Sequence, residues 1–225
     1  MNPNINSNIS SNIITNNEAT TVNTTSIPTH FQVYNKSIFA GVMIAIAGTA
    51  NLSVDNKYIG AFLFSFGLIT IIIQNWWLYT GKIGIVELPK GISRLAVTLL
   101  GNLIGVNFVI VGLILTNKIH TLQEKAYAIV ESKLNASLVS IFILAVFCGI
   151  MMYLAVDGYQ KNKNLLMIIF PIMIFILCGF EHSIANMYYF LISGAVTPRG
   201  LIEIVIMILG NTVGSLIMKV SRILK

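Results

Sequence analysis

Long apolar runs constrain this sequence more than any other feature. Six of them follow one another along the chain, separated by short polar stretches, at positions 36–53, 58–80, 94–116, 134–156, 164–192 and 201–221. A helix needs about 20 predominantly apolar residues to cross a bilayer, and each run is near or above that length. The fifth run is longer than one simple span requires. We therefore expect an all-α membrane protein with about six transmembrane helices.

The composition excludes a soluble globular protein. Hydrophobic residues make up 56% of the chain and charged residues only 10%, whereas soluble proteins carry about 25% charged residues. The net charge of +6 does not indicate a nucleic-acid partner, because the 14 Lys and Arg residues lie between the apolar runs rather than along one face. The expected partner is the lipid bilayer.

The basic residues between the runs predict the orientation, since cytoplasmic loops carry an excess of Lys and Arg. With the N-terminus inside, nine basic residues lie on the inner side: Lys36, Lys82, Lys90, Arg94, Lys161, Lys163, Lys219, Arg222 and Lys225. Five lie on the outer side: Lys57, Lys118, Lys125, Lys133 and Arg199. This excess predicts a multi-pass protein of the cell membrane with both termini in the cytoplasm.

The first 30 residues differ from the rest of the chain. Positions 1–30 are rich in Asn, Thr, Ser and Ile and almost without charge, which is typical of disordered low-complexity segments. We expect a disordered tail over 1–30 and a six-helix transmembrane domain over 31–225. The two cysteines indicate neither a disulfide framework nor a paired metal motif, and no cofactor is predicted.

A short motif occurs twice. Positions 101–105 and 210–214 both read G-N-x-x-G and lie three runs apart. Three helices later the chain crosses the membrane in the opposite direction, so the motif indicates an inverted 3+3 repeat, an arrangement found in transporters and channels. Alternatively, the small residues let helices pack closely, and both interpretations can hold together. The asparagines of the two motifs, Asn102 and Asn211, are candidate pore residues.

Polar interruptions occur at matching places in the two halves, at 74–81 and 178–186. Unpaired backbone groups cannot face lipid, so broken helices occur where they are buried in protein or line a cavity. Paired interruptions of this kind are the best sequence indication of a permeation site. We therefore expect the second and fifth helices to be broken.

Two ionisable residues, Glu181 and His182, lie within the second interruption. Such residues are costly inside a membrane, so by default they indicate a functional site. His182 is the candidate pore residue, and a neutral, hydrogen-bonded packing role is its alternative. Because neighbouring residues on a helix do not share a face, Glu181 is expected to point away from the pore. There it would bond a broken helix end or a neighbouring subunit.

The string G-F-E-H-S-I-A-N-M at 179–187 resembles the signature of the formate/nitrite transporter family. The stretch L-Y-T-G at 78–81 resembles the family's L-F-T-G, and the two G-N-x-x-G motifs also fit. The resemblance covers about 36–222 and implies an aquaporin-like fold in a homopentamer, with one pore per protomer. It also implies transport of small monovalent anions such as formate, nitrite, lactate or hydrosulfide.

The resemblance further implies roles for individual residues. His182 matches the central pore histidine, Thr80 the threonine that faces it, and Lys133 a vestibule lysine. Asn186, within the signature, is a further candidate for the pore. The cytoplasmic-side constriction is matched by Phe64, Leu68 and Phe175, and the outer constriction by Leu78 and Tyr79.

The chain departs from the family pattern at three positions and in one loop. The family's usual Glu before L-F-T-G is Trp77, the Asn after it is Lys82, and the fourth-helix Asn of the formate members is Gly149. The connection between the fifth and sixth runs is also short. These differences bear on the substrate more than on the fold.

The anion of a weak acid suits these residues. Lys133 attracts an anion, and a dry slit of Phe and Leu makes an unpaired charge costly. Desolvation raises the pKa of the acid, so the anion takes a proton and crosses as the neutral acid. His182 either supplies that proton or steers the anion by hydrogen bonding.

Two other functions fit less well. An aquaporin-like pore for small neutral solutes would carry paired N-P-A motifs, which the sequence lacks. A membrane-embedded enzyme would need a metal cluster or an activated nucleophile. Of His30, His120 and His182, only His182 lies within an apolar run, and no H-E-x-x-H or G-x-S-x-G motif is present. We therefore expect a channel and not an enzyme.

Overall fold

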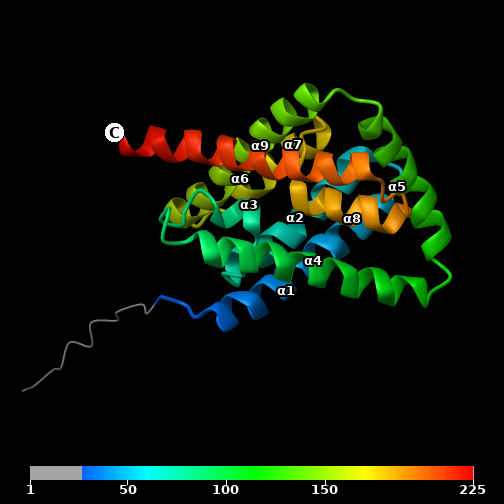
Figure 1. Cartoon of the computed structure of the whole chain (residues 1–225), viewed down its shortest axis with the longest axis horizontal. Helices are drawn as coiled ribbons and strands as arrows, with labels where there is room; N and C mark the ends of the chain where they lie inside the picture. The colour runs from blue at the N-terminus through cyan, green and yellow to red at the C-terminus, as the bar shows by residue number, and fades with distance from the viewer. Residues whose placement is uncertain (1–26, 225) are drawn as a thin grey trace, which may run out of the picture.

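The structure is a computed structural model that describes residues 27–224, in which all regular elements are helices (Figure 1). This part of the chain forms α1 (His30–Leu52), α2 (Lys57–Ile73), α3 (Tyr79–Lys82), α4 (Ile92–Ile114), α5 (Ile119–Leu134), α6 (Leu138–Asn162), α7 (Leu166–Leu177), α8 (Ser183–Ser193) and α9 (Pro198–Ile223). Of the expected tail over 1–30, residues 1–26 lie outside the described part, and its disorder stays a prediction.

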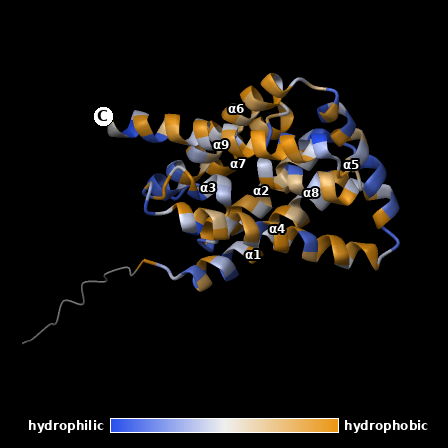
Figure 2. Ribbon diagram, in the orientation of Figure 1, coloured by the Kyte–Doolittle hydropathy of each residue, from blue (hydrophilic) through white to orange (hydrophobic). Residues whose placement is uncertain are grey.

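Four helices, α1, α4, α6 and α9, are long and apolar enough to cross a membrane. α2 and α7 are apolar but shorter, at 17 and 12 residues. Hydrophobic residues cover the middle of the bundle, and hydrophilic residues gather along α5 at one end and around α3 and its following loop toward the other (Figure 2). This banded distribution suits a helical protein embedded in a bilayer. The start of α1 and the end of α9 both lie at the end opposite α5 (Figure 1).

Two helix pairs, α1 with α4 and α6 with α9, make the most extensive contacts of the fold. At Gly105 of α4, an added Cβ would overlap the carbonyl oxygen of Ile38 in α1. At Gly214 of α9, it would overlap the carbonyl oxygen of Val146 in α6. A side chain at either glycine would push the two backbones apart. The expectation that the G-N-x-x-G motifs allow close helix packing is therefore confirmed.

The second and fifth apolar runs each form two helices. Residues 74–78 separate α2 from α3, and residues 178–182 separate α7 from α8. Asn75 in the first gap and Gly179 in the second have positive φ angles of 51° and 68°. Asn and Gly tolerate this left-handed region better than other residues do. Each gap therefore turns the backbone sharply before a short helix begins.

α5 has no counterpart among the six predicted spans. Its buried residues, Ile119, Leu122, Ala126 and Val130, are spaced three or four apart, as in an amphipathic helix. The helix packs against α8. Its outward face is polar, so no long apolar run marks it in the sequence. α5 places Lys133 in its last turn, close to the gap before α8.

Candidate pore site

A buried asparagine in α4 holds the gap between α2 and α3. The side chain of Asn102 accepts a hydrogen bond from the backbone N–H of Tyr79 at 3.0 Å. It donates to the carbonyl oxygens of Ser37 and Trp77, both at 2.8 Å. Both amide donors and the amide oxygen are thus used by the backbone. They fix the start of α3 against α1 and α4.

Asn211 in α9 makes three equivalent bonds in the other half. It accepts from the N–H of Ser183 at 2.9 Å and donates to the carbonyl oxygens of Ala145 and Glu181, both at 2.8 Å. Asn211, like Asn102, is fully buried. Because backbone groups use both amides, this geometry favours a role in holding the helix gaps. A direct contact of either asparagine with a solute stays a prediction.

His182 stands at the N-terminus of α8 and is almost completely buried. Its Nδ1 accepts a hydrogen bond from the N–H of Ala185 at 3.1 Å, and its Nε2 lies 2.9 Å from Oγ1 of Thr80 in α3. Since Nδ1 is an acceptor, the neutral ring carries its proton on Nε2 and donates it to Thr80. The hydroxyl hydrogen of Thr80 is then available to another acceptor.

A cavity of about 190 Å³ lies between α5 and His182. Its lining consists of Asn51, Phe64, Ile129, Lys133, Phe175, Ile176, Gly179, Phe180, His182, Ala185 and Tyr189. The rings of Phe64 and Phe175 meet edge to face, 5.9 Å apart between centroids, and Phe175 stacks on the imidazole of His182 at 5.6 Å. Aromatic rings therefore border His182 on the α5 side.

A second, smaller cavity lies further along α2, on the side of α3. Its lining consists of Leu68, Ile71, Ile72, Asn75, Trp76, Leu78, Gly81, Lys82, Met152, Val156 and Gln160. Phe64 borders the larger cavity, and Leu68, one helical turn later in α2, borders the smaller one. The cavities thus group Phe64 with Phe175 and Leu68 with Leu78, and Tyr79 lines neither. The division of these residues into a cytoplasmic-side and an outer constriction stays a prediction.

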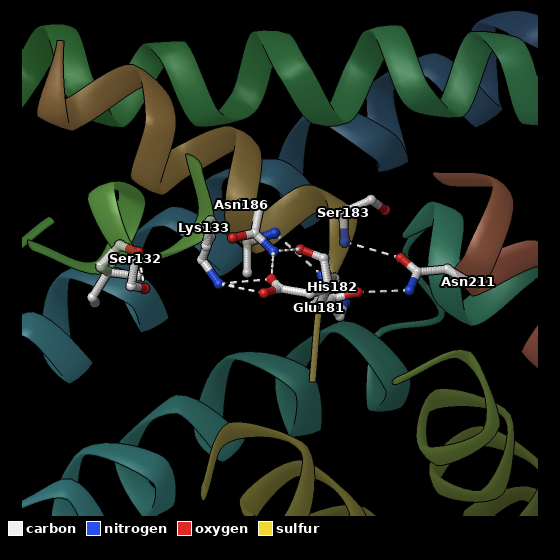
Figure 3. Close-up of polar contacts among 9 residues, drawn as sticks. Ser132, Lys133, Glu181, His182, Ser183, Asn186 and Asn211 are labelled. Atoms are coloured by element: carbon white, nitrogen blue, oxygen red, sulfur yellow. Dashed lines mark hydrogen bonds and ion pairs between the residues drawn. The ribbon is translucent and has the colours of Figure 1, made fainter. Parts of the chain in front are cut away.

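Lys133 lines the larger cavity, and its charge is paired (Figure 3). Its Nζ lies 2.8 and 2.7 Å from the two carboxylate oxygens of Glu181. Both side chains are largely buried, with exposed fractions of 14% and 5%. The Nδ2 of Asn186 donates to the same carboxylate at 2.8 Å and to the carbonyl oxygen of His182 at 3.0 Å. The charge of Lys133 is therefore paired within the protomer, and its role as a vestibule lysine stays a prediction.

Comparison with known proteins decides the family. The model of the formate/nitrite transporter family matches residues 11–222. The chain belongs to the formate/nitrite transporter family. A pentameric formate channel with formate bound shares the fold, with a TM-score of 0.74, 23% identity, and coverage of 84% of this chain and 94% of that one. An FNT family ion channel gives a TM-score of 0.66 at 23% identity, with coverage of 84% and 86%.

Two curated relatives match only part of this chain and part of their own length. The uncharacterized transporter YrhG of Bacillus subtilis is 32% identical over 152 residues, which are 59% of this chain and 56% of YrhG. The formate channel FocA of Haemophilus influenzae is 26% identical over 184 residues, which are 70% of this chain and 65% of FocA. The chain thus spans less than two thirds of the length of either relative. Membership in a transporter family agrees with the expectation that the chain is not an enzyme.

Two positions at which this chain departs from the pattern of the formate/nitrite transporter family can be examined in the structure. They are Gly149 and Lys82. An added Cβ at Gly149 would overlap the carbonyl oxygen of Asn211, so the packing of α6 on α9 leaves no room for an Asn there. Lys82 lines the smaller cavity, and its Nζ lies 5.3 Å from the centre of the Trp77 ring. Lys82 is thus a cavity residue outside the predicted site.

Asn51 and Tyr189 are further cavity residues that sequence reasoning missed. They line the larger cavity, and Nδ2 of Asn51 donates to the hydroxyl of Tyr189 at 3.2 Å. Tyr189 lies two helical turns after His182, so the period of α8 is a signal that indicates it. Asn51 lies at the far end of α1 in an apolar run and has no such signal.

Proposed function

We propose that this chain forms a channel through which small monovalent anions of weak acids cross the cell membrane. The candidate substrates are formate, nitrite, lactate and hydrosulfide. Family membership and the fold of solved formate channels support this proposal. The observation that carries it is the 2.9 Å hydrogen bond between His182 and Thr80, where two helix gaps meet close to both cavities. A polar pair in this apolar interior offers a permeating solute a hydrogen-bond partner.

The proposed topology has six spans in an aquaporin-like inverted 3+3 repeat. The first half comprises α1, α2 with α3, and α4, and the second comprises α6, α7 with α8, and α9. The equivalent bonds of Asn102 and Asn211 support the repeat, because each joins the last helix of its half to the gap in the second span. The start of α1 and the end of α9 lie at the same end of the bundle, which supports an even number of spans (Figure 1). The excess of basic residues supports cytoplasmic termini.

We also propose a homopentamer with one pore per protomer. The solved relative that is a pentameric formate channel supports this assembly. Large apolar side chains remain exposed along α4 and α9 of one protomer, among them Leu100, Phe108, Val111, Leu201, Val205 and Leu209. Surfaces of this kind need lipid or another protomer as a neighbour.

In the proposed mechanism, an anion enters the larger cavity and meets the rings of Phe64 and Phe175. An unpaired charge is costly between apolar side chains, so desolvation raises the pKa of the solute acid and favours its neutral form. The Thr80 hydroxyl accepts the proton of His182 Nε2 and offers its own hydrogen to the solute. A protonated His182 would lose the bond from Ala185, because both ring nitrogens would be donors. We therefore assign His182 a hydrogen-bonding role; the anion takes its proton from the aqueous solution, and the proton then crosses on the weak acid.

Flux in proteoliposomes tests the proposal. Formate, nitrite, lactate and hydrosulfide are compared with glycerol, a neutral solute, and with empty liposomes. We expect flux of at least one anion above the empty liposomes, faster at acidic pH, and no glycerol flux. Glycerol flux without anion flux would instead support a neutral-solute pore and contradict the proposal.

A matched pair of variants then tests the site itself. Thr80→Val removes the hydroxyl at nearly constant volume, and we expect it to lower anion flux. Thr98→Val is the control, because its buried hydroxyl bonds only the Arg94 carbonyl oxygen of its own helix, and Thr98 lines neither cavity. Equal flux in both variants would remove Thr80 from the proposed mechanism.

A further inference from the structure

Lys82 brings positive charge to the smaller cavity, which it lines from the end of α3. Its Nζ donates to Oδ1 of Asn75 at 2.6 Å and lies 5.3 Å from the centre of the Trp77 ring. Among residues 27–224, no carboxylate lies within ion-pair distance of this Nζ. Within the described part of the chain, the charge of Lys82 is therefore not paired with an opposite charge.

The positions of Trp77 and Glu181 correspond in the two halves. The carbonyl oxygen of each accepts a 2.8 Å hydrogen bond from a buried asparagine, Asn102 for Trp77 and Asn211 for Glu181. Each also lies two residues before the backbone N–H that the same asparagine binds. Trp77 thus occupies, at the first helix gap, the place that Glu181 occupies at the second.

The lysines beside these two positions meet different partners. Lys133 forms an ion pair with Glu181, and the net charge of that pair is zero. Lys82 meets an amide oxygen and the Trp77 ring, which hold a cation without cancelling its charge. Apolar walls around a charge of one sign concentrate counter-ions at a mouth. The α3 side of the pore is consequently the more positive of the two.

We propose that Lys82 draws anions into the pore from the α3 side and gives that mouth the higher apparent affinity for anions. This inference rests on the proposed anion transport. Among the residues that the structure describes, Trp77 leaves the charge of Lys82 unpaired, whereas a carboxylate at position 77 would pair with Lys82 as Glu181 pairs with Lys133. The departures of this chain from the family pattern at both positions therefore act together.

Sided uptake of radiolabelled formate tests the inference, in right-side-out and inverted vesicles at low ionic strength. A cleavable tag after the C-terminus reports the orientation. Lys219, near the end of α9, donates to the carbonyl oxygen of Val86 at 2.9 Å, so this end lies on the α3 side. We expect Lys82→Gln to raise the half-saturating formate concentration from the α3 side by about tenfold. From the α5 side, the half-saturating concentration should stay at the parental value.

Two further variants separate charge from structure. Lys82→Arg keeps the positive charge and should keep the parental half-saturation from both sides. Lys90→Gln is the matched control. Lys90 is exposed in the loop after α3 and lines neither cavity, so this variant removes a positive charge outside the pore. Raised half-saturation in Lys90→Gln equal to that in Lys82→Gln would show a general surface effect and overturn the inference.

The remaining outcomes distinguish the inference from the proposed function. A parent protein that conducts none of the four candidate anions refutes the proposed function. A conducting parent with unchanged half-saturation in Lys82→Gln, or with equal changes from both sides, refutes only the role of Lys82. If Lys82→Gln does not assemble, the parent alone still decides: salt should raise its half-saturation more from the α3 side than from the α5 side. Equal salt effects on both sides would overturn the inference.

Discussion

Each ring nitrogen of His182 has its own partner, and the two partners decide what the side chain contributes. A protonated ring would present two donors, and one of them would face the N–H of Ala185, which is itself a donor. The neutral ring accepts from Ala185 and donates to Thr80 at the same time. At the scale of the residue, His182 is therefore suited to hydrogen bonding in the pore rather than to carrying positive charge.

We expect His182→Phe to lower anion flux about tenfold or more, and His182→Asn to retain more flux. Phe removes both hydrogen bonds, and a buried polar group left without its partner costs about 1–3 kcal/mol. Asn is a good N-cap residue for α8 and keeps a donor for Thr80. Proteoliposome flux between about pH 5 and 8, the range in which His titrates, measures both variants, and oligomer size in detergent is the control. If His182→Asn keeps the flux but loses the parental pH dependence, His182 titrates and the hydrogen-bonding role is wrong.

The ion pair of Lys133 and Glu181 should stabilise the fold, because removing one partner of a buried pair costs about 3–5 kcal/mol. We expect Lys133→Met and Glu181→Gln each to lower the melting temperature in detergent, and the double variant to recover part of the loss. Lys125→Met is the control, since its pair with Asp55 is exposed and such pairs contribute about 0–1 kcal/mol. Strictly additive losses in the double variant would show that Lys133 and Glu181 act independently.

At the scale of elements, α4 offers two glycines with opposite surroundings. An added Cβ at Gly105 overlaps the Ile38 carbonyl oxygen in α1, whereas at Gly112 it meets open space. We expect Gly105→Ala to lower the melting temperature and to disturb assembly. Gly112→Ala should raise stability slightly, because Ala is favoured over Gly in a helix by roughly 0.5–1 kcal/mol. Similar melting temperatures for the two variants would mean that close contact of α1 with α4 does not stabilise the fold.

The sequence predicts some features of the helices and misses others. Both polar interruptions fall at the gaps after α2 and α7, because polar groups within an apolar run are a local signal. The apolar runs do not predict α5, because an amphipathic helix carries no long apolar run. The pairing of Lys133 with Glu181 joins residues 48 positions apart, and no spacing indicates it. The separation of Phe64 from Leu68 into different cavities likewise depends on how α2 packs against its neighbours.

At the scale of the whole molecule, the positions of the first and last helices predict the topology. The start of α1 and the end of α9 share one end of the bundle, and α5 lies at the other (Figure 1). We expect reporters fused to either terminus to be active in the cytoplasm, and a reporter in the α5–α6 connection to be active outside. Termini on opposite sides of the membrane would contradict both the six spans and the orientation from basic residues.

Each protomer already contains both cavities and the His182–Thr80 pair, so the proposed pentamer holds five separate pores. Only about a third of the membrane spans of α4 and α9 is buried within one protomer, 33% in each, which leaves their outer faces to lipid and neighbours. Native mass spectrometry in detergent should therefore show five copies.

In pentamers mixed from parent and His182→Phe protomers, flux should fall in proportion to the variant fraction, because each pore works alone. A pore shared at the five-fold axis would instead lose flux much more steeply, since one altered protomer would affect the whole assembly. A stable monomer that conducts like the parent would show that assembly is not needed for transport.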